Sequence, residues 1–146
     1  MTETELTTTP NLENPDYYIN RELSLLQFHL RVLEQAMDER HPLLERLNFL
    51  LIFSSNMDEF FEIRVAGLKD KLETGTGQPG PDGMLPGEVL AEISRITHEA
   101  VERQYRALNE VLLPRLAAEG VRFLRREQLT EAQETWVKRY FRDQIY

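Results

Sequence analysis

The segment FSSNMDEFFEIR, residues 53–64, holds the side chains of this sequence best suited to contact a ligand. Two serines and an asparagine interrupt what is otherwise typical of a long helix, and an acidic pair and two phenylalanines come directly after them. On a helix, Asn56 shares a stripe with apolar residues at offsets of three, four and seven, namely Phe49, Ile52, Phe53, Phe60 and Ile63. An amide on such a stripe needs hydrogen-bond partners, because leaving it unpaired costs roughly 1–3 kcal/mol.

Asn56 has two interpretations. Its amide offers one acceptor and two donors, which complement the edge of a nucleobase, and neighbouring phenylalanines supply flat apolar walls for such a ring. The alternative is structural: a buried asparagine that bonds a neighbouring helix or a loop carbonyl, as most buried polar groups do. Ser54 and Ser55 are open to the same alternatives, since they either keep the surface open near a ligand or bond carbonyls one turn earlier.

The acidic residues of the segment do not predict a metal site. Only Asp58 and Glu62 lie one turn apart on a shared face, and no Glu-x-x-His spacing accompanies them, although carboxylate di-metal bundles need that motif on two helices. A charge run including Glu59 is more typical of a solvated helix face. Arg64 either pairs with these acids or faces a phosphate.

No self-contained catalytic site is predicted. The three histidines, His29, His41 and His98, show no metal-ligand spacing with each other, and no serine–histidine–acid pattern is present. The glycine-rich stretch at residues 75–87 lacks both the P-loop and the dinucleotide-binding spacing. We therefore assign no catalytic residue within this chain.

Composition narrows the class of protein. A chain of 146 residues fits one domain, and its formal charge of −8 disfavours general nucleic-acid binding. There are no cysteines, so disulfides and thiolate metal sites are excluded. The acidic, threonine-rich N-terminus is not a signal peptide, and no run of about 18 apolar residues is present to span a membrane. These features predict a cytosolic protein without a transmembrane segment.

The periodicity predicts an all-α fold: an antiparallel bundle of three main helices plus a C-terminal helix. Ser24 and Gln27 have capping-box spacing, with Leu23 and Phe28 placed as a hydrophobic staple, so we expect the first helix to begin there. Its expected inner stripe comprises Leu25, Phe28, Val32, Gln35, Ala36 and Glu39. His41-Pro42 should end this helix and start the next, because proline disfavours a helical residue before it.

The second helix is expected over residues 42–73. Five of the seven glycines and three of the seven prolines then lie between Gly75 and Gly87, which predicts a long, mobile loop. A third helix has its apolar period in Val89, Ile93, Ile96, Ala100, Leu108 and Val111. Pro114 should kink or break it by removing the bond to the Glu110 carbonyl, and Gly120 should end it.

The last part of the chain is expected to differ from the bundle. Residues 121–124, VRFL, have the composition of a short strand, and Thr130 with Gln133 forms a capping box for a final helix. That helix carries Trp136, Tyr140, Phe141 and Ile145 to the end of the chain without a polar tail, so the chain looks cut. We expect a disordered tail at 1–16, a helical domain at 17–119, and the truncated start of a following domain at 120–146.

Three segments together resemble the start of polyphosphate kinase, the long family that works through a phosphohistidine. They are NRELSLLQFHLRVLEQAMD at 20–38, HPLLERLNFLLIFSSNMDEFFEIRVAGLK at 41–69 and REQLTEAQETWVKRYF at 126–141. The resemblance is dense over residues 18–73, weakens through the loop and third helix, and returns after Gly120. One departure is Leu25, where many members have tryptophan; we interpret it as a packing variation.

The resemblance implies a function for the parent enzyme and a role for one residue. The family reversibly transfers the terminal phosphate of ATP to inorganic polyphosphate with magnesium, and its N-terminal helical bundle packs over the nucleotide site. The asparagine of its Ser-Asn/Ser-Asn-Leu/Met-Asp-Glu-Phe motif contacts ATP, and Asn56 stands at that position here. Phe49, Phe53 and Arg64 are weaker candidates for the ATP pocket.

The resemblance also implies that the catalytic parts lie elsewhere. The family's phosphorylated histidine, magnesium-associated arginines and polyphosphate channel belong to later domains, so none of the three histidines here takes the catalytic role and this chain binds no magnesium itself. The parent enzyme is implied to be a cytoplasmic homo-oligomer, with peripheral membrane association left open. The alternative is a stand-alone helical interaction module without enzymatic activity, whose apolar stripes bind a partner helix.

Overall fold

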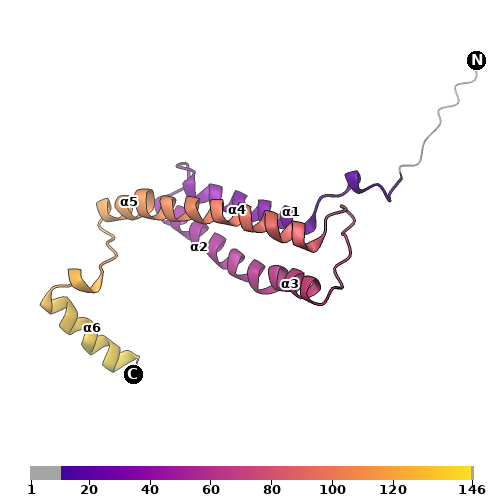
Figure 1. Cartoon of the computed structure of the whole chain (residues 1–146). Helices are drawn as coiled ribbons and strands as arrows, with labels where there is room; N and C mark the ends of the chain where they lie inside the picture. The colour runs from indigo at the N-terminus through magenta and orange to yellow at the C-terminus, as the bar shows by residue number, and fades with distance from the viewer. Residues whose placement is uncertain (1–10, 146) are drawn as a thin grey trace, which may run out of the picture.

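The computed structural model describes residues 11–145, and every regular element in that range is helical (Figure 1). Three long helical segments follow one another, each antiparallel to the one before it in the chain (Figure 1), as predicted, and a fourth helix comes after them. The first long segment is α1 (Arg21–Met37); the second comprises α2 (Leu43–Glu59), a π-helical segment (Phe60–Val65) and α3 (Ala66–Glu73). The third comprises α4 (Pro86–Arg106), a π-helical segment (Ala107–Leu112) and α5 (Leu113–Ala118). Short 3-10 turns, Pro15–Tyr17 and Arg126–Gln128, precede α1 and α6 (Glu131–Gln144).

Helix α1 begins one turn before the predicted position. The Asn20 side chain accepts hydrogen bonds from the backbone N–H groups of Glu22 and Leu23 at 3.0 and 3.1 Å, so asparagine is the N-cap. The Ser24 N–H already donates to the Asn20 carbonyl, as an interior helical residue does. The capping box at Ser24 and the staple that involves Phe28 are therefore wrong, because a strong cap lies upstream.

The buried face of α1 also differs from the predicted stripe. Its buried residues are Leu26, His29, Leu33 and Ala36, and of these only Ala36 was expected. Leu25 and Leu26 are adjacent apolar residues on two neighbouring faces, so periodicity alone does not choose between them. Packing against both α2 and α4 selects the face of Leu26.

The turn between the first two segments lies where predicted, since α1 ends at Met37 and α2 begins just after Pro42. The buried Arg46 side chain reinforces this turn. Its Nε donates to the Ala36 carbonyl at 2.9 Å, which satisfies an acceptor in the last turn of α1. The first two segments are thus fixed side by side.

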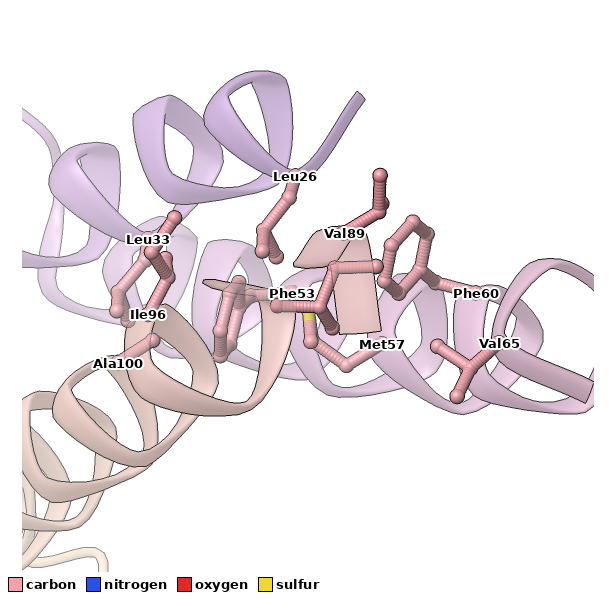
Figure 2. Close-up of a cluster of buried hydrophobic side chains, with 10 residues drawn as sticks. Leu26, Leu33, Phe53, Met57, Phe60, Val65, Val89, Ile96 and Ala100 are labelled. Atoms are coloured by element: carbon pink, nitrogen blue, oxygen red, sulfur yellow. The ribbon is translucent and has the colours of Figure 1, made fainter. Parts of the chain in front are cut away.

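The core fills the space between the three segments. Figure 2 shows the main cluster, to which α1, the second segment and α4 all contribute. Its buried members are Leu26, Leu33, Phe53, Met57, Phe60, Val65, Val89, Ile93, Ile96 and Ala100. A second cluster of Ala36, Leu50, Ala107 and Leu112 lies toward the other end of the bundle.

The two π segments shift the helical register. The core residues Phe60 and Val65 lie five positions apart, as do Ala107 and Leu112, which suits the i to i+5 repeat of a π turn. Ile63, predicted to share an apolar stripe with Asn56 and Phe60, is 58% exposed for this reason.

The third long segment passes Pro114 without a break. The Leu113 N–H donates to the Leu108 carbonyl five residues back, so the helix widens where we expected a kink or break. The register shift also means that Ala107 and Leu112 are buried, while the predicted Leu108 and Val111 are only partly so.

Two glycines end the second and third segments. Gly75 and Gly120 have φ of +66° and +86°, a left-handed conformation that glycine adopts without strain. The next N–H groups along the chain close Schellman motifs, for example Val121 N–H to the Leu116 carbonyl at 2.8 Å. Gly120 thus ends the third segment as predicted.

A glycine- and proline-rich loop joins α3 to α4 at the predicted position, and its mobility stays a prediction. It is tied to the start of α1, because the Asn20 Nδ2 donates to the Asp82 Oδ2 at 2.8 Å. One asparagine therefore caps α1 and holds the loop at the same time.

The segment after Gly120 differs from the bundle. Residues 121–124 are irregular, not a strand, since no described segment pairs with them. The capping box of Thr130 and Gln133 is confirmed, with the Gln133 Oε1 accepting from the Thr130 N–H at 2.9 Å. Helix α6 stands apart from the bundle and none of its residues is buried (Figure 1). The predicted tail lies outside the described residues at 1–10, while Pro15–Tyr17 forms a turn.

Candidate functional site

A hollow of about 240 Å³ lies between α1 and the junction of α2 with the first π segment. Residues from both helical segments line it: Leu25, His29, Asn56, Glu59, Phe60, Ile63 and Arg64. It brings together two of the residues singled out from sequence, Asn56 and Arg64. His29 lines the same hollow from the opposite wall.

Asn56 lies at the border between the core and the surface. Met57 beside it is buried, whereas Asn56 itself is half-buried and opens to the hollow. Within the described residues its side chain makes no hydrogen bond to a neighbouring helix or loop carbonyl, the partner that the structural alternative requires. One acceptor and two donors therefore remain available at the wall of the hollow.

The first π segment places Arg64 at the edge of the hollow. In a continuous α-helix, eight residues at about 100° each would set Arg64 about 80° away from Asn56. A π turn absorbs roughly one extra residue, which reduces the offset to about 20° and brings the two side chains to one face. The same shift buries Val65, not Arg64, in the core.

Arg64 is only loosely held. Its Nε lies 3.9 Å from the Glu22 Oε2, beyond hydrogen-bond distance, and its side chain is 35% exposed. Arg64 therefore pairs with an acid from α1, not with Asp58 or Glu62 of its own helical segment. The Glu22 Oε2 is buried and has no hydrogen-bond partner in the described part of the chain.

His29 forms part of the opposite wall. It is 6% exposed, and its ring meets those of Phe28 and Phe60 edge to face, with centroids 5.7 and 5.9 Å apart. Burial lowers the pKa of His29 below its ordinary 6.5, and the nearby Glu59 carboxylate partly opposes this. The imidazole is consequently neutral at pH 7.

Two of the weaker sequence candidates do not line the hollow. Phe53 is fully buried in the core, with no surface left for a ligand. Phe49 packs in the second core cluster, where its ring lies 5.2 Å from that of His41. The structure thus brings Asn56 and Arg64 together without either phenylalanine. Phe60 lines the hollow, but its ring belongs to the core and is only 2% exposed.

The remaining titratable candidates have local partners. A His41 ring nitrogen, Nε2, lies 3.0 Å from the Gln35 Oε1, and the His98 Nδ1 lies 2.7 Å from the Ser94 carbonyl. Within residues 11–145, no three histidine or acidic side chains gather as a metal site would require. Sequence reasoning did not include His29 and Glu22 in the site, because no local pattern on α1 indicates which face meets the second segment.

Comparison with known proteins identifies the family. The model of the polyphosphate kinase N-terminal domain matches residues 18–124. The chain belongs to this family. A polyphosphate kinase of Pseudomonas aeruginosa is 60% identical over 134 residues, covering 92% of this chain and 19% of the relative. Polyphosphate kinases of Halalkalibacterium halodurans and Thermosynechococcus vestitus are each 46% identical, over 137 and 136 residues, covering 93% of this chain and 19% of each relative.

The chain therefore spans about a fifth of the length of these polyphosphate kinases, at the position of the N-terminal domain. No solved structure matches it. Among the helices of residues 11–145, none is both long enough and apolar enough to cross a membrane.

Proposed function

We propose that this domain forms the nucleotide side of the active site of a polyphosphate kinase, with Asn56 hydrogen-bonding the base of ATP or ADP. The observation that supports this most is the unbonded amide of Asn56 at the wall of the hollow. The partly buried Leu25 and the exposed Ile63 line the same hollow and offer apolar surface to a planar ligand.

The charges around the hollow favour the base over the phosphates. Glu59 lines it and Glu22 lies beside Arg64, so carboxylates outnumber the single guanidinium at the hollow by two to one. A triphosphate would be repelled from the interior, whereas a neutral ring would not. The phosphates would then extend outward, where Arg64 at the edge is the one cation among the described residues that line the hollow.

In the parent enzyme, this domain would serve the reversible transfer of the terminal phosphate of ATP to inorganic polyphosphate. The catalytic groups and the Mg²⁺ would come from the other four-fifths of the enzyme, since the match covers 19% of the relative. The domain alone would be inactive and would bind ATP weakly, because a half-open hollow leaves most of the ligand in water. We further propose a cytoplasmic, homo-oligomeric parent.

The Asn56→Ala variant of the full-length enzyme tests the assignment. Losing one or two hydrogen bonds of roughly 1 kcal/mol each should raise the KM for ATP about five- to thirtyfold. Asn48→Ala is the matched control, because Asn48 is an exposed asparagine on the same helix, away from the hollow. An unchanged KM for ATP in Asn56→Ala would reject the role of Asn56.

A second function, a helical interaction module without enzymatic activity, is favoured by one observation. Helix α6 exposes Trp136, Val137, Tyr140, Phe141 and Ile145, and the Trp136 and Tyr140 rings stack 5.2 Å apart. Self-association that persists in full-length protein, measured by analytical ultracentrifugation, would support a genuine binding surface. Association confined to the 146-residue chain would instead indicate a face that another domain covers.

A further inference from the structure

The His29 side chain presents an unpaired polar group beside the hollow. Its Nδ1 is buried and has no hydrogen-bond partner in the described part of the chain, and no described residue bonds the other ring nitrogen, Nε2. Buried polar atoms are almost always paired in folded proteins, because leaving one unpaired is costly. The unpaired imidazole nitrogen at this position therefore calls for a reason beyond packing.

The position of His29 suggests that reason. Its ring is fixed edge to face against Phe28 and Phe60, so its orientation is set before any ligand arrives. The side chain is 6% exposed, and it lines the hollow together with Asn56. Each wall thus contributes one polar side chain without a hydrogen-bond partner in the described chain, the imidazole from α1 and the amide from α2.

We propose that His29 is a second base-contacting residue, which hydrogen-bonds the nucleobase held by Asn56 and helps to set which base is accepted. This inference rests on the proposed nucleotide-binding function. It goes further by assigning specificity to a residue of α1, outside the segment at 53–64.

The chemistry of the two groups suits discrimination between bases. A neutral imidazole presents one donor and one acceptor, and an amide presents both as well. Adenine and guanine differ in that donors and acceptors are exchanged along the edge of the six-membered ring. A site that pairs with one pattern leaves its own buried groups unpaired against the other, which gives selectivity beyond simple fit.

The experiment compares ATP and GTP as substrates of the full-length enzyme in three variants. His29→Leu removes both nitrogens, His29→Gln keeps a polar atom near the position of Nε2, and His29→Asn keeps one near Nδ1. We expect His29→Leu to change the ratio of kcat/KM for ATP to that for GTP about five- to tenfold. In one of the two amide variants, this ratio should return part of the way to the wild-type value.

His98→Leu is the matched control, because His98 is an exposed histidine of α4. An unchanged ratio, with equal losses for both nucleotides, would show that His29 only packs the core and would overturn the inference. If His29→Leu does not fold, the amide variants decide the question: they should differ from each other in the ratio. Wild-type ratios in both would overturn the inference.

The proposed function and this inference fail in different ways. If Asn56→Ala raises the KM for ATP while His29→Leu leaves the ratio unchanged, only the role of His29 is lost. If neither variant changes nucleotide kinetics, the hollow is not a nucleotide site and both proposals are lost.

Discussion

The two π-helical segments share one geometry but differ in their surroundings. Each places two buried residues five positions apart, Phe60 with Val65 and Ala107 with Leu112. Each continues an α-helix on both sides, so neither is a frayed end. They differ in the residues that come next along the chain and in the surface that lies beside them.

The second π segment has a cause in the backbone. Pro114 comes shortly after it, and proline lacks an N–H and has a ring that would strike the carbonyl four residues back in an α-helix. Widening the preceding turn relieves that clash. Its outward residues, Asn109 and Glu110, are exposed and do not line the hollow that holds Asn56.

The first π segment has no proline within it or shortly after it. The hollow lies beside it instead, and the register shift is what aligns Arg64 with Asn56. Single π turns within α-helices are frequent at functional sites. The difference therefore supports a ligand-related role for the first π segment and a purely structural one for the second.

The largest expected effects on stability come from the buried residues of the two π segments. Phe60→Ala should lower the free energy of unfolding by about 3–5 kcal/mol and Leu112→Ala by about 2–5 kcal/mol, since both side chains are buried and leave cavities. Urea unfolding monitored by circular dichroism measures this. Ile63→Ala is the control and should cost under about 0.5 kcal/mol. A large cost at Ile63 would contradict the register that the π segment gives this residue.

Deleting one exposed residue from each π segment should show whether a proline causes that segment to form. Deletion of Glu110 converts the second π segment to an α turn, which returns Pro114 to a clash and should cost about 3 kcal/mol. Deletion of Ile63 meets no proline and should cost under about 1 kcal/mol. Adding Pro114→Ala should recover most of the loss for Glu110 only. Equal costs without recovery would show that proline is not the cause.

These register shifts mark the limit of what the sequence predicts. The helices, the turn at His41-Pro42, the stop at Gly120 and the capping box at Thr130 all derive from local signals, and they are confirmed. Ile63 was predicted to share an apolar stripe with Phe60, because an apolar residue three positions later fits the repeat of an α-helix. Val65, five positions later, fits the repeat of a π-helix equally well. Only packing across three helical segments decides between these two registers.

The site shows the same limit. Asn56 stands out because an amide on an apolar stripe is unusual within one helix, and that signal is local. His29 carries no such signal, since its relevance depends on α1 presenting the face of Leu26 and not that of Leu25. Phe53 was included because proximity in sequence suggested proximity in the pocket, yet its side chain points into the core (Figure 2).

A smaller effect is expected from Arg64, whose alignment depends on the first π segment. In the full-length enzyme, Arg64→Ala should raise the KM for ATP by up to about fivefold, because a partly exposed charge contributes about 1 kcal/mol at most. The effect should shrink at high salt. Arg103→Ala is the matched control, since Arg103 faces Glu34 at a similarly loose 4.0 Å but lies away from the hollow. Equal effects of both variants would indicate a general loss of charge.

The smallest expected effect is on the pH dependence of stability. It should come from His29, which packs on Phe60 of the first π segment. Burial lowers the pKa of His29 from 6.5, so the unfolded chain binds the proton more readily than the folded one. The contribution of neutral His29 to stability is therefore complete above pH 6.5 and is lost as the pH falls below 6.5 toward the lowered pKa. The drop in unfolding free energy from about pH 7.5 to about pH 5.5 should be smaller in His29→Gln than in the wild type.

Two comparisons isolate this dependence on His29. The exposed His98, changed to glutamine, should leave the pH dependence of the wild type unaltered. Asp38, whose pKa is lowered by hydrogen bonds from Arg40 and by its charge, titrates below its ordinary 3.8 and so outside the window. Identical pH dependence in wild type and His29→Gln would mean that water reaches the imidazole freely. The surface beside the first π segment would then be open to water. A ligand-related role that distinguishes this segment from the second would have weaker support.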